Sequence, residues 1–194
     1  MIKLIVFMGE AGSGKDRMLN EILASDASLN RVVSYTTRPK RENEVEGRDY
    51  YYMSENDFFE LTKIGSMYEY SLHHWWYGTG VNSYDENKIN IAVLNPEGIR
   101  SLIDDSRFDI TVYWVRADAK TRLLRQLNRE DNPDCNEIIR RYGTDTADFA
   151  QINFDYIDLP NNNIEELREA LWTVQQDIKM LKTAPPHSSL DISD

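Results

Sequence analysis

A glycine-rich segment near the start of the chain has the residue types and spacing of a phosphate-binding loop. Residues 9–15 read Gly-Glu-Ala-Gly-Ser-Gly-Lys, between an apolar run and a helical pattern. In such a loop the glycines let backbone N–H groups wrap around phosphates, and the lysine reaches the β- and γ-phosphates of a nucleoside triphosphate. A connector without a ligand would not require a lysine at this position. The residues expected to bind ATP are Gly9, Glu10, Ala11, Gly12, Ser13, Gly14, Lys15, Asp16 and Arg17.

Asp16 stands where such loops usually carry Ser or Thr, whose hydroxyl binds Mg²⁺. Its carboxylate is a hard oxygen ligand suited to Mg²⁺, directly or through water. Aspartate is equally a favourable residue in the first turn of a helix. Both interpretations stay open, and the first predicts a metal site at Asp16.

Residues 34–50, SYTTRPKRENEVEGRDY, are rich in basic and aromatic side chains. Arg38 and Arg41 could hold a phosphate group through bidentate hydrogen bonds, and Tyr50 could add a phenolic donor. Surface salt bridges would explain a lone arginine, but not this segment.

This segment resembles the monophosphate-binding segment of guanylate kinases, which reads S-x-T-T-R-x-x-R-x-x-E-x-x-G-x-D-Y. The matching positions are Ser34, Thr36, Thr37, Arg38, Arg41, Glu44, Gly47, Asp49 and Tyr50. Downstream, Tyr68-Glu69-Tyr70 and Tyr77-Gly78-Thr79 are similar to the elements that read the base in this family. The resemblance implies that Glu69 accepts hydrogen bonds from guanine N1 and the 2-amino group. It implies that Ser34 and Thr79 donate to O6, and that Tyr77 reaches the phosphate.

Between these two elements, residues 73–76 read His-His-Trp-Trp. Adjacent side chains of a strand point to opposite faces, so we predict packing and loop roles here rather than a metal site.

The stretch IAVLNPEG, residues 91–98, departs from the family. Guanylate kinases usually have acidic residues at the positions of Val93 and Asn95, near the metal and the guanine amino group. Asn95 could still accept one hydrogen bond from the acceptor. Alternatively, Val93 belongs to the core and Asn95 caps the helix that Pro96 opens.

Arg125 and Arg129 lie four residues apart on one predicted helical face, and Arg140 follows eleven residues later. This spacing resembles the lid of guanylate kinases. The resemblance implies that the three arginines close over ATP and stabilise the transferring phosphoryl group. A solvated basic face is the alternative. The predicted catalytic residues are Lys15, Arg38, Arg125, Arg129 and Arg140, and Asn161 aligns with a family residue near the adenine.

Strands alternate with helices along the chain, which predicts an α/β fold with a mainly parallel sheet. We expect strands at 2–8, 89–94, 110–115 and 155–159, and helices at 16–24, from 96 onward, at 118–127, 136–152 and 164–181. The fold class is then a P-loop core (1–33 and 86–182) with an inserted monophosphate-binding subdomain (34–85), a short helical lid (about 125–141) and a flexible tail (183–194). For the insert we expect an irregular segment with short strands and one helix at 56–63.

Composition limits the function. The 194 residues suffice for one sizeable core, and no apolar run approaches the roughly 20 residues of a membrane span. The net charge of −11 argues against nucleic acid as a partner. Cys135 is the single cysteine, which excludes an internal disulfide and fits a reducing cytoplasm. The expected partners are ATP and GMP or dGMP, without nucleic acid or membrane, in a monomer or homodimer.

The resemblance spans residues 1–180 and implies Mg²⁺-dependent phosphoryl transfer from ATP to GMP or dGMP. Two alternatives stay open. A kinase for another deoxynucleotide or a ribose bisphosphate is favoured by Gly-Lys-Asp but disfavoured by Glu69. A non-catalytic guanylate-kinase-like binding module typically loses the loop lysine and the lid arginines, which this chain keeps.

Overall fold

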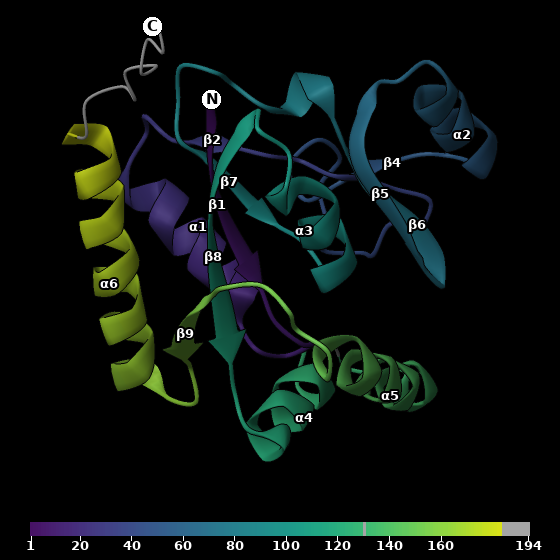
Figure 1. Ribbon diagram of the computed structural model, residues 1–194. Coiled ribbons are helices and arrows are strands. Elements are labelled where there is room, and N and C mark those ends of the chain that lie inside the picture. Colours follow the sequence, from purple (N-terminus) through teal and green to yellow (C-terminus); the bar gives the residue numbers. More distant parts are fainter. Residues whose placement is uncertain (130, 184–194) are drawn as a thin grey trace, which may run out of the picture.

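The centre of the molecule is a five-stranded parallel sheet, seen in the computed structural model, which describes residues 1–129 and 131–183 (Figure 1). Its strand order is β2-β7-β1-β8-β9. The strands are β2 (Asn30–Arg31), β7 (Asn90–Val93), β1 (Ile2–Met8), β8 (Phe108–Arg116) and β9 (Ile157–Pro160). β1 pairs with both β7 and β8, and both of its faces are covered. A strand covered on both faces must be almost wholly apolar, which explains its sequence IKLIVFM.

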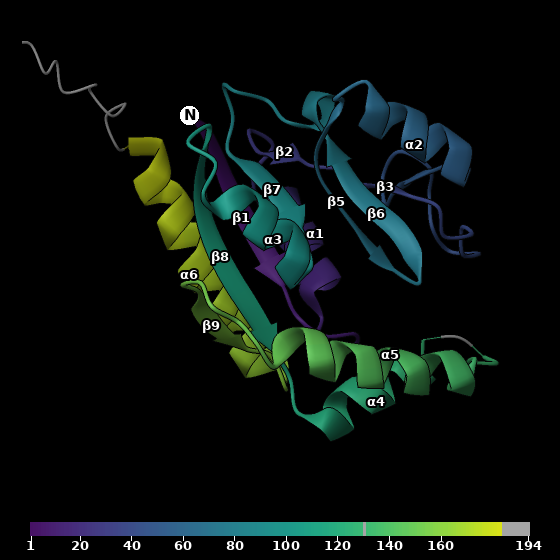
Figure 2. The same cartoon turned by 45° about the vertical axis from the view of Figure 1, so that its right-hand side comes forward.

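Helices cover the two faces of this sheet. On one face, Ile5 and Phe7 of β1 pack against α1 (Lys15–Ser25) and α6 (Ile164–Thr183). On the other face, Leu4 and Val6 pack against α3 (Pro96–Ile103). The alternation along β1 therefore divides the core into two layers, and Figure 2 shows α3 and α6 on opposite sides of the sheet.

A second sheet with the order β4-β3-β6-β5 lies beside the first. It consists of β4 (Tyr51–Tyr52), β3 (Tyr35–Thr36), β6 (Trp75–Gly80) and β5 (Met67–His73), with α2 (Glu55–Lys63) packed on it and a 3-10 turn at Val81–Ser83. The helix and the short strands expected in the insert are confirmed, but the insert is less irregular than expected, because β5 and β6 form a long hairpin. Phe58 of α2 packs against Tyr70 and Trp76. This confirms the packing role predicted for Trp76.

Two helices, α4 (Ala119–Leu127) and α5 (Cys135–Phe149), lie at the edge of the parallel sheet where β1 and β8 end (Figures 1 and 2). We call them the lid helices. Asp118 and Asp134 cap their N-termini by accepting hydrogen bonds from Thr121 N and Glu137 N. Arg122 is the only buried residue of α4, and α5 has none. The lid helices therefore contribute little to the apolar core.

The predicted helices and strands agree closely with the structure. The short strand β2 was not predicted, because two residues give no periodicity. The helix expected at 136–152 ends at Phe149, whose ring packs on Trp114 of β8. The predicted flexible tail lies outside the described residues from 184 onward. Among the described helices, none is both long and apolar enough to cross a membrane.

Candidate active site

A cavity of about 890 Å³ lies between the phosphate loop, the second sheet and the lid helices. It brings together most of the predicted site residues: Gly9, Ala11, Lys15, Asp16, Ser34, Arg38, Arg41, Tyr50, Glu69, Tyr77, Asn95, Arg129 and Arg140. The predicted site residues outside its lining are Glu10, Gly12, Ser13, Gly14, Arg17, Thr79, Arg125 and Asn161. Segments far apart in the sequence therefore meet at one site, as the predicted kinase requires.

The phosphate loop joins β1 to α1, and its backbone explains its glycines. Gly12 has a φ of 81° and Gly14 a φ of 94°, which side chains other than hydrogen disfavour. A Cβ at Gly12 would lie 2.5 Å from the carbonyl oxygen of Arg122. The close approach of α4 therefore also demands glycine.

Two side chains support this loop from outside the cavity. Asn161 Nδ2 donates to the carbonyl of Ser13 at 2.7 Å. Arg125 donates to the carbonyls of Gly12 at 3.3 Å, Ser13 at 3.1 Å and Asn161 at 2.8 Å. These contacts engage the loop carbonyls. The roles predicted for Arg125 at the phosphoryl group and Asn161 at the adenine stay predictions.

Glu10 of the loop forms a buried ion pair with Arg122, which the sequence analysis missed. Their nearest side-chain atoms are 2.5 Å apart, and Trp114 Nε1 donates to the other carboxylate oxygen at 3.2 Å. The Arg122 side chain is 6% exposed and stacks over Tyr142 of α5 at 4.9 Å. Removing one partner of such a pair leaves a buried charge, so the pair fixes α4 against the loop.

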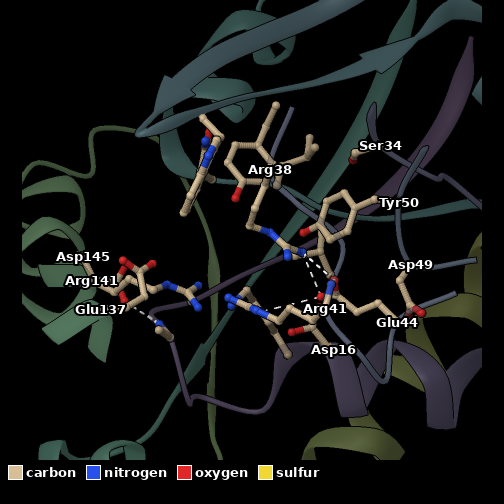
Figure 3. A pocket seen from close by; sticks show the side chains of 18 of the residues that line it. Asp16, Ser34, Arg38, Arg41, Glu44, Asp49, Tyr50, Glu137, Arg141 and Asp145 are labelled. Atoms are coloured by element: carbon tan, nitrogen blue, oxygen red, sulfur yellow. Dashed lines mark hydrogen bonds and ion pairs between the residues drawn. The ribbon is translucent and has the colours of Figure 1, made fainter. Parts of the chain in front are cut away.

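A second contact joins the loop to α5. The backbone N–H of Ala11 donates to Asp145 Oδ2 at 2.5 Å, and both residues line the cavity. In Figure 3, Asp145 lies beside Arg141 and Glu137 on the lid side of the cavity. A carboxylate thus occupies an N–H group of the loop that is predicted to bind phosphate oxygens.

On the acceptor side, Glu44 organises the basic residues. Both of its oxygens accept from Arg38 Nη2, at 2.8 and 3.0 Å, and Tyr52 OH donates at 2.8 Å. Burial alone would raise the Glu44 pKa, but these hydrogen bonds and the N–H of Arg41 lower it to about 2. Arg38 also donates to the carbonyl of Pro39 and lies over the rings of Tyr50 and Tyr52. A guanidinium has five N–H donors, so Arg38 keeps donors for a ligand.

Arg41 lies at a point where several cations converge. Burial lowers its pKa, and the charges of Arg38, Arg141 and Arg129 lower it further. Figure 3 shows Arg41, from the segment between β3 and β4, and Arg141, from α5, reaching toward each other. Glu44, whose Oε1 lies 3.6 Å from Arg41 Nη1, offsets this repulsion only in part, because the net shift of the Arg41 pKa is downward.

The structure distinguishes the two adjacent arginines of α5. Arg140, predicted as catalytic, donates to both carboxylate oxygens of Glu137 at 2.7 and 2.9 Å. Arg141, which was not predicted, is the α5 arginine whose charge acts on Arg41 and Tyr50. The spacing of Glu137, Arg141 and Asp145, each four residues apart, could have indicated this face.

The far end of the cavity holds a buried carboxylate. Glu69 is 5% exposed and lies opposite Thr79 in the β5–β6 pair. Burial raises its pKa to about 7, although hydrogen bonds from Thr79 lower it. Thr79 and Tyr84 share a hydrogen bond of 2.8 Å. Thr79 lies outside the cavity lining, and its predicted contact with guanine O6 stays a prediction.

Asn95 caps α3, which confirms one of its two interpretations. Its Oδ1 accepts from Gly98 N at 2.7 Å, and its Nδ2 donates to Ser71 Oγ at 2.8 Å. Val93 packs against the core and also lines the cavity. Asn95, which stands where guanylate kinases usually have an acidic residue, therefore uses both its carbonyl oxygen and its amide nitrogen in hydrogen bonds.

Two carboxylates of the cavity lining lie near the phosphate loop, Asp16 and Asp145, and Asp145 already accepts a hydrogen bond from Ala11 N. Asp16 is exposed at the start of α1, and its charge acts on Arg31 and Tyr50. The part of the chain that the structure describes has no group of three His, Cys, Asp or Glu residues that could hold a metal. Mg²⁺ in kinases is commonly held by one or two carboxylates together with substrate phosphates, so the donor set fits Mg²⁺ bound with ATP.

Comparisons with known proteins find guanylate kinases similar to this chain in sequence and in fold. A guanylate kinase from Wolbachia pipientis wMel is 27% identical over 190 residues, covering 94% of each chain. A guanylate kinase from Thermotoga maritima is 29% identical and covers 89% of this chain and 85% of its own. The crystal structure of a guanylate kinase from Anaplasma phagocytophilum shares the fold, with a TM-score of 0.70, 18% identity, and 94% and 88% coverage. The sequence model of the guanylate kinase family matches residues 1–179, and the chain therefore belongs to this family.

Proposed function

We propose that this protein transfers the γ-phosphoryl group of ATP to GMP or dGMP. Family membership supports GMP as acceptor and ATP as donor. The single observation that carries the proposal is the convergence of Arg41, Arg129 and Arg141 between the phosphate loop and the buried Glu69. A phosphate among these cations would relieve the repulsion that Glu44 offsets only in part, and a base with N–H donors would match the carboxylate of Glu69.

The order of groups along the cavity suggests how the two substrates lie. The triphosphate binds the loop N–H groups and Lys15. The acceptor phosphate lies at Arg38 and Arg41, near the phenols of Tyr50 and Tyr77, and its base reaches Glu69. Guanine presents two N–H groups to this carboxylate, whereas adenine lacks that pair and would leave the carboxylate unsatisfied.

The transfer needs little covalent chemistry from the protein. An oxygen of the acceptor phosphate attacks the γ-phosphorus, and the bond from that phosphorus to the β–γ bridging oxygen breaks, so that ADP leaves. Lys15, Arg129 and Arg141 are placed to neutralise the charge that spreads over the moving group. The lid helices exclude water, which would otherwise accept the phosphoryl group.

Mg²⁺ belongs to this proposal as the partner of ATP. Asp16 would hold the ion together with the phosphates, and the ion neutralises their charge when it is bound. Asp16→Asn should raise the Mg²⁺ concentration needed for half-maximal activity and should strengthen ATP binding without metal. An unchanged Mg²⁺ dependence of both would leave Asp16 as a residue of the first helical turn.

A coupled assay of ADP release over GMP, dGMP, AMP, CMP and UMP tests the proposed function. We expect GMP and dGMP to be phosphorylated much faster than the others. Equal rates with AMP and GMP would contradict the assignment of Glu69, and turnover of none of the five would contradict the proposed function.

A further inference from the structure

Ser71 is a buried residue of the acceptor side to which no role has been assigned above. We propose that its hydroxyl group, oriented by Asn95, donates a hydrogen bond to N3 of the acceptor base. This inference rests on the proposed function, since it names a further contact to the same substrate.

Ser71 lies beside Glu69 on one face of β5. Residues two apart on a strand share a face, and both side chains line the cavity. Glu69 is 5% and Ser71 2% exposed. A polar side chain this deeply buried needs a hydrogen-bond partner in the protein or in a ligand.

The hydrogen bonds of Asn95 determine that the Ser71 hydroxyl group can act as a donor to a ligand. The N–H of Gly98 can only donate, so the atom of Asn95 that lies 2.7 Å from it must be the carbonyl oxygen Oδ1. The other side of the amide is then Nδ2, which donates to Ser71 Oγ at 2.8 Å. Ser71 therefore accepts from Asn95, and its own proton points elsewhere. The described residues provide no acceptor for that proton, while the cavity adjoins it.

The arrangement of donors and acceptors on guanine indicates that N3 accepts from Ser71. When guanine presents N1 and its 2-amino group to Glu69, the next polar atom around the ring is N3, which is an acceptor. Ser71 follows Glu69 by two residues on the same face of β5 and contacts Asn95, so its hydroxyl group can donate to N3 while Glu69 accepts from N1 and the 2-amino group. This contact fixes the position of a purine ring, while Glu69 distinguishes guanine from adenine.

The test combines Ser71→Ala with 3-deaza-GMP, in which carbon replaces N3. For wild-type protein we expect kcat/KM to be roughly 3- to 10-fold lower with 3-deaza-GMP than with GMP, as for one neutral hydrogen bond. Ser71→Ala should cause a similar loss with GMP, mainly through KM, and no further loss with 3-deaza-GMP. The KM for ATP should not change.

Two variants act as controls. Ser71→Thr keeps the hydroxyl and should retain the preference for GMP over 3-deaza-GMP. Ser101→Ala makes the same deletion on the exposed side of α3, where the hydroxyl bonds to Glu97 O, and should change nothing.

Three results would overturn the proposal. The first is an equal kcat/KM for GMP and 3-deaza-GMP in wild-type protein, and the second is a kcat/KM for GMP that Ser71→Ala does not change. The third is a further loss of kcat/KM when Ser71→Ala is assayed with 3-deaza-GMP, because the hydroxyl and N3 would then act independently. The wild-type comparison decides even if the variant fails to fold. Failure of wild-type protein to phosphorylate GMP would contradict the proposed function instead, so the two failures are distinguishable.

Discussion

The parallel sheet and the lid helices are held in place by different forces. Six of the seven residues of β1 are buried, and they pack against apolar side chains from α1, α3 and α6. By contrast, α5 has 15 residues and none is buried. The lid helices reach the phosphate loop through polar contacts: the Glu10–Arg122 ion pair, the Ala11–Asp145 hydrogen bond and the bonds of Arg125 to loop carbonyls.

This difference indicates which part of the molecule can change its position when a substrate binds. The apolar side chains that hold the sheet in place offer no group to which a phosphate could bind, so ATP cannot compete with their contacts. One of the polar contacts of the lid helices, the hydrogen bond from Ala11 N to Asp145, uses a backbone N–H group of the kind that binds phosphate in such loops. We therefore expect the lid helices to respond to ATP and the sheet to stay unchanged.

The largest expected effect concerns the two arginines of α5. Arg141→Ala should lower kcat by about 10³-fold, the scale of an arginine that stabilises a transferring phosphoryl group. Arg140→Ala is the matched control, and its effect should be much smaller because Glu137 already neutralises Arg140. Thermal unfolding should be nearly the same for both variants, since neither is part of the core. A larger loss of kcat in Arg140→Ala would reverse this assignment.

The second prediction contrasts an isoleucine of the sheet with one of the lid. Ile5→Ala should lower the free energy of unfolding by roughly 2–5 kcal/mol, because Ile5 is fully buried. Ile139→Ala removes the same atoms from α5, where the side chain is 70% exposed, and should cost less than about 0.5 kcal/mol. Denaturant unfolding measures both. A similar cost at the two sites would show that α5 is part of the cooperative core.

The third prediction uses the raised pKa of Glu69. The carboxylate must be ionised to accept from guanine, and burial raises its pKa to about 7, with hydrogen bonds from Thr79 opposing the shift and the nearby charge of Glu97 adding to it. The kcat/KM for GMP should therefore rise as pH increases through 7, by about tenfold between pH 6 and pH 8. The GMP phosphate also titrates near pH 6, so Glu69→Gln is the control: its profile should keep only that phosphate titration. A wild-type profile identical to that of Glu69→Gln would exclude Glu69 as the titrating group.

The smallest expected effect tests the contact between Asp145 and the phosphate loop. Asp145→Asn weakens a charge-assisted hydrogen bond to Ala11 N and removes a negative charge near the ATP site, so ATP should bind roughly 3- to 10-fold more tightly. Asp131→Asn removes the same charge from the cavity lining, where the structure describes no bond to the loop, and should have less effect. Calorimetric titration with ATP measures both affinities. The amide proton signal of Ala11 should shift only in Asp145→Asn, and weaker ATP binding in that variant would mean that Asp145 assists the nucleotide.

The phosphate loop and the order of helices and strands could be predicted from the sequence, and most of the residues predicted to bind the acceptor line the cavity. These features follow from local rules: glycines where the backbone needs left-handed angles, a continuous apolar run for a strand covered on both faces, and fixed spacing within one segment. Residues such as Lys15, Arg38 and Arg41 could be predicted because a single short segment carries each motif.

Contacts between residues that are distant in sequence became visible only in the tertiary structure. Arg122 was not predicted because its partner Glu10 is more than a hundred residues away. The choice between Arg140 and Arg141 depends on the rotation of α5 about its axis, and the donor role of Ser71 depends on the hydrogen bonds of Asn95. A side chain's type sets which bonds it can make, but only the packed fold decides which of those bonds are already used and which remain for a substrate.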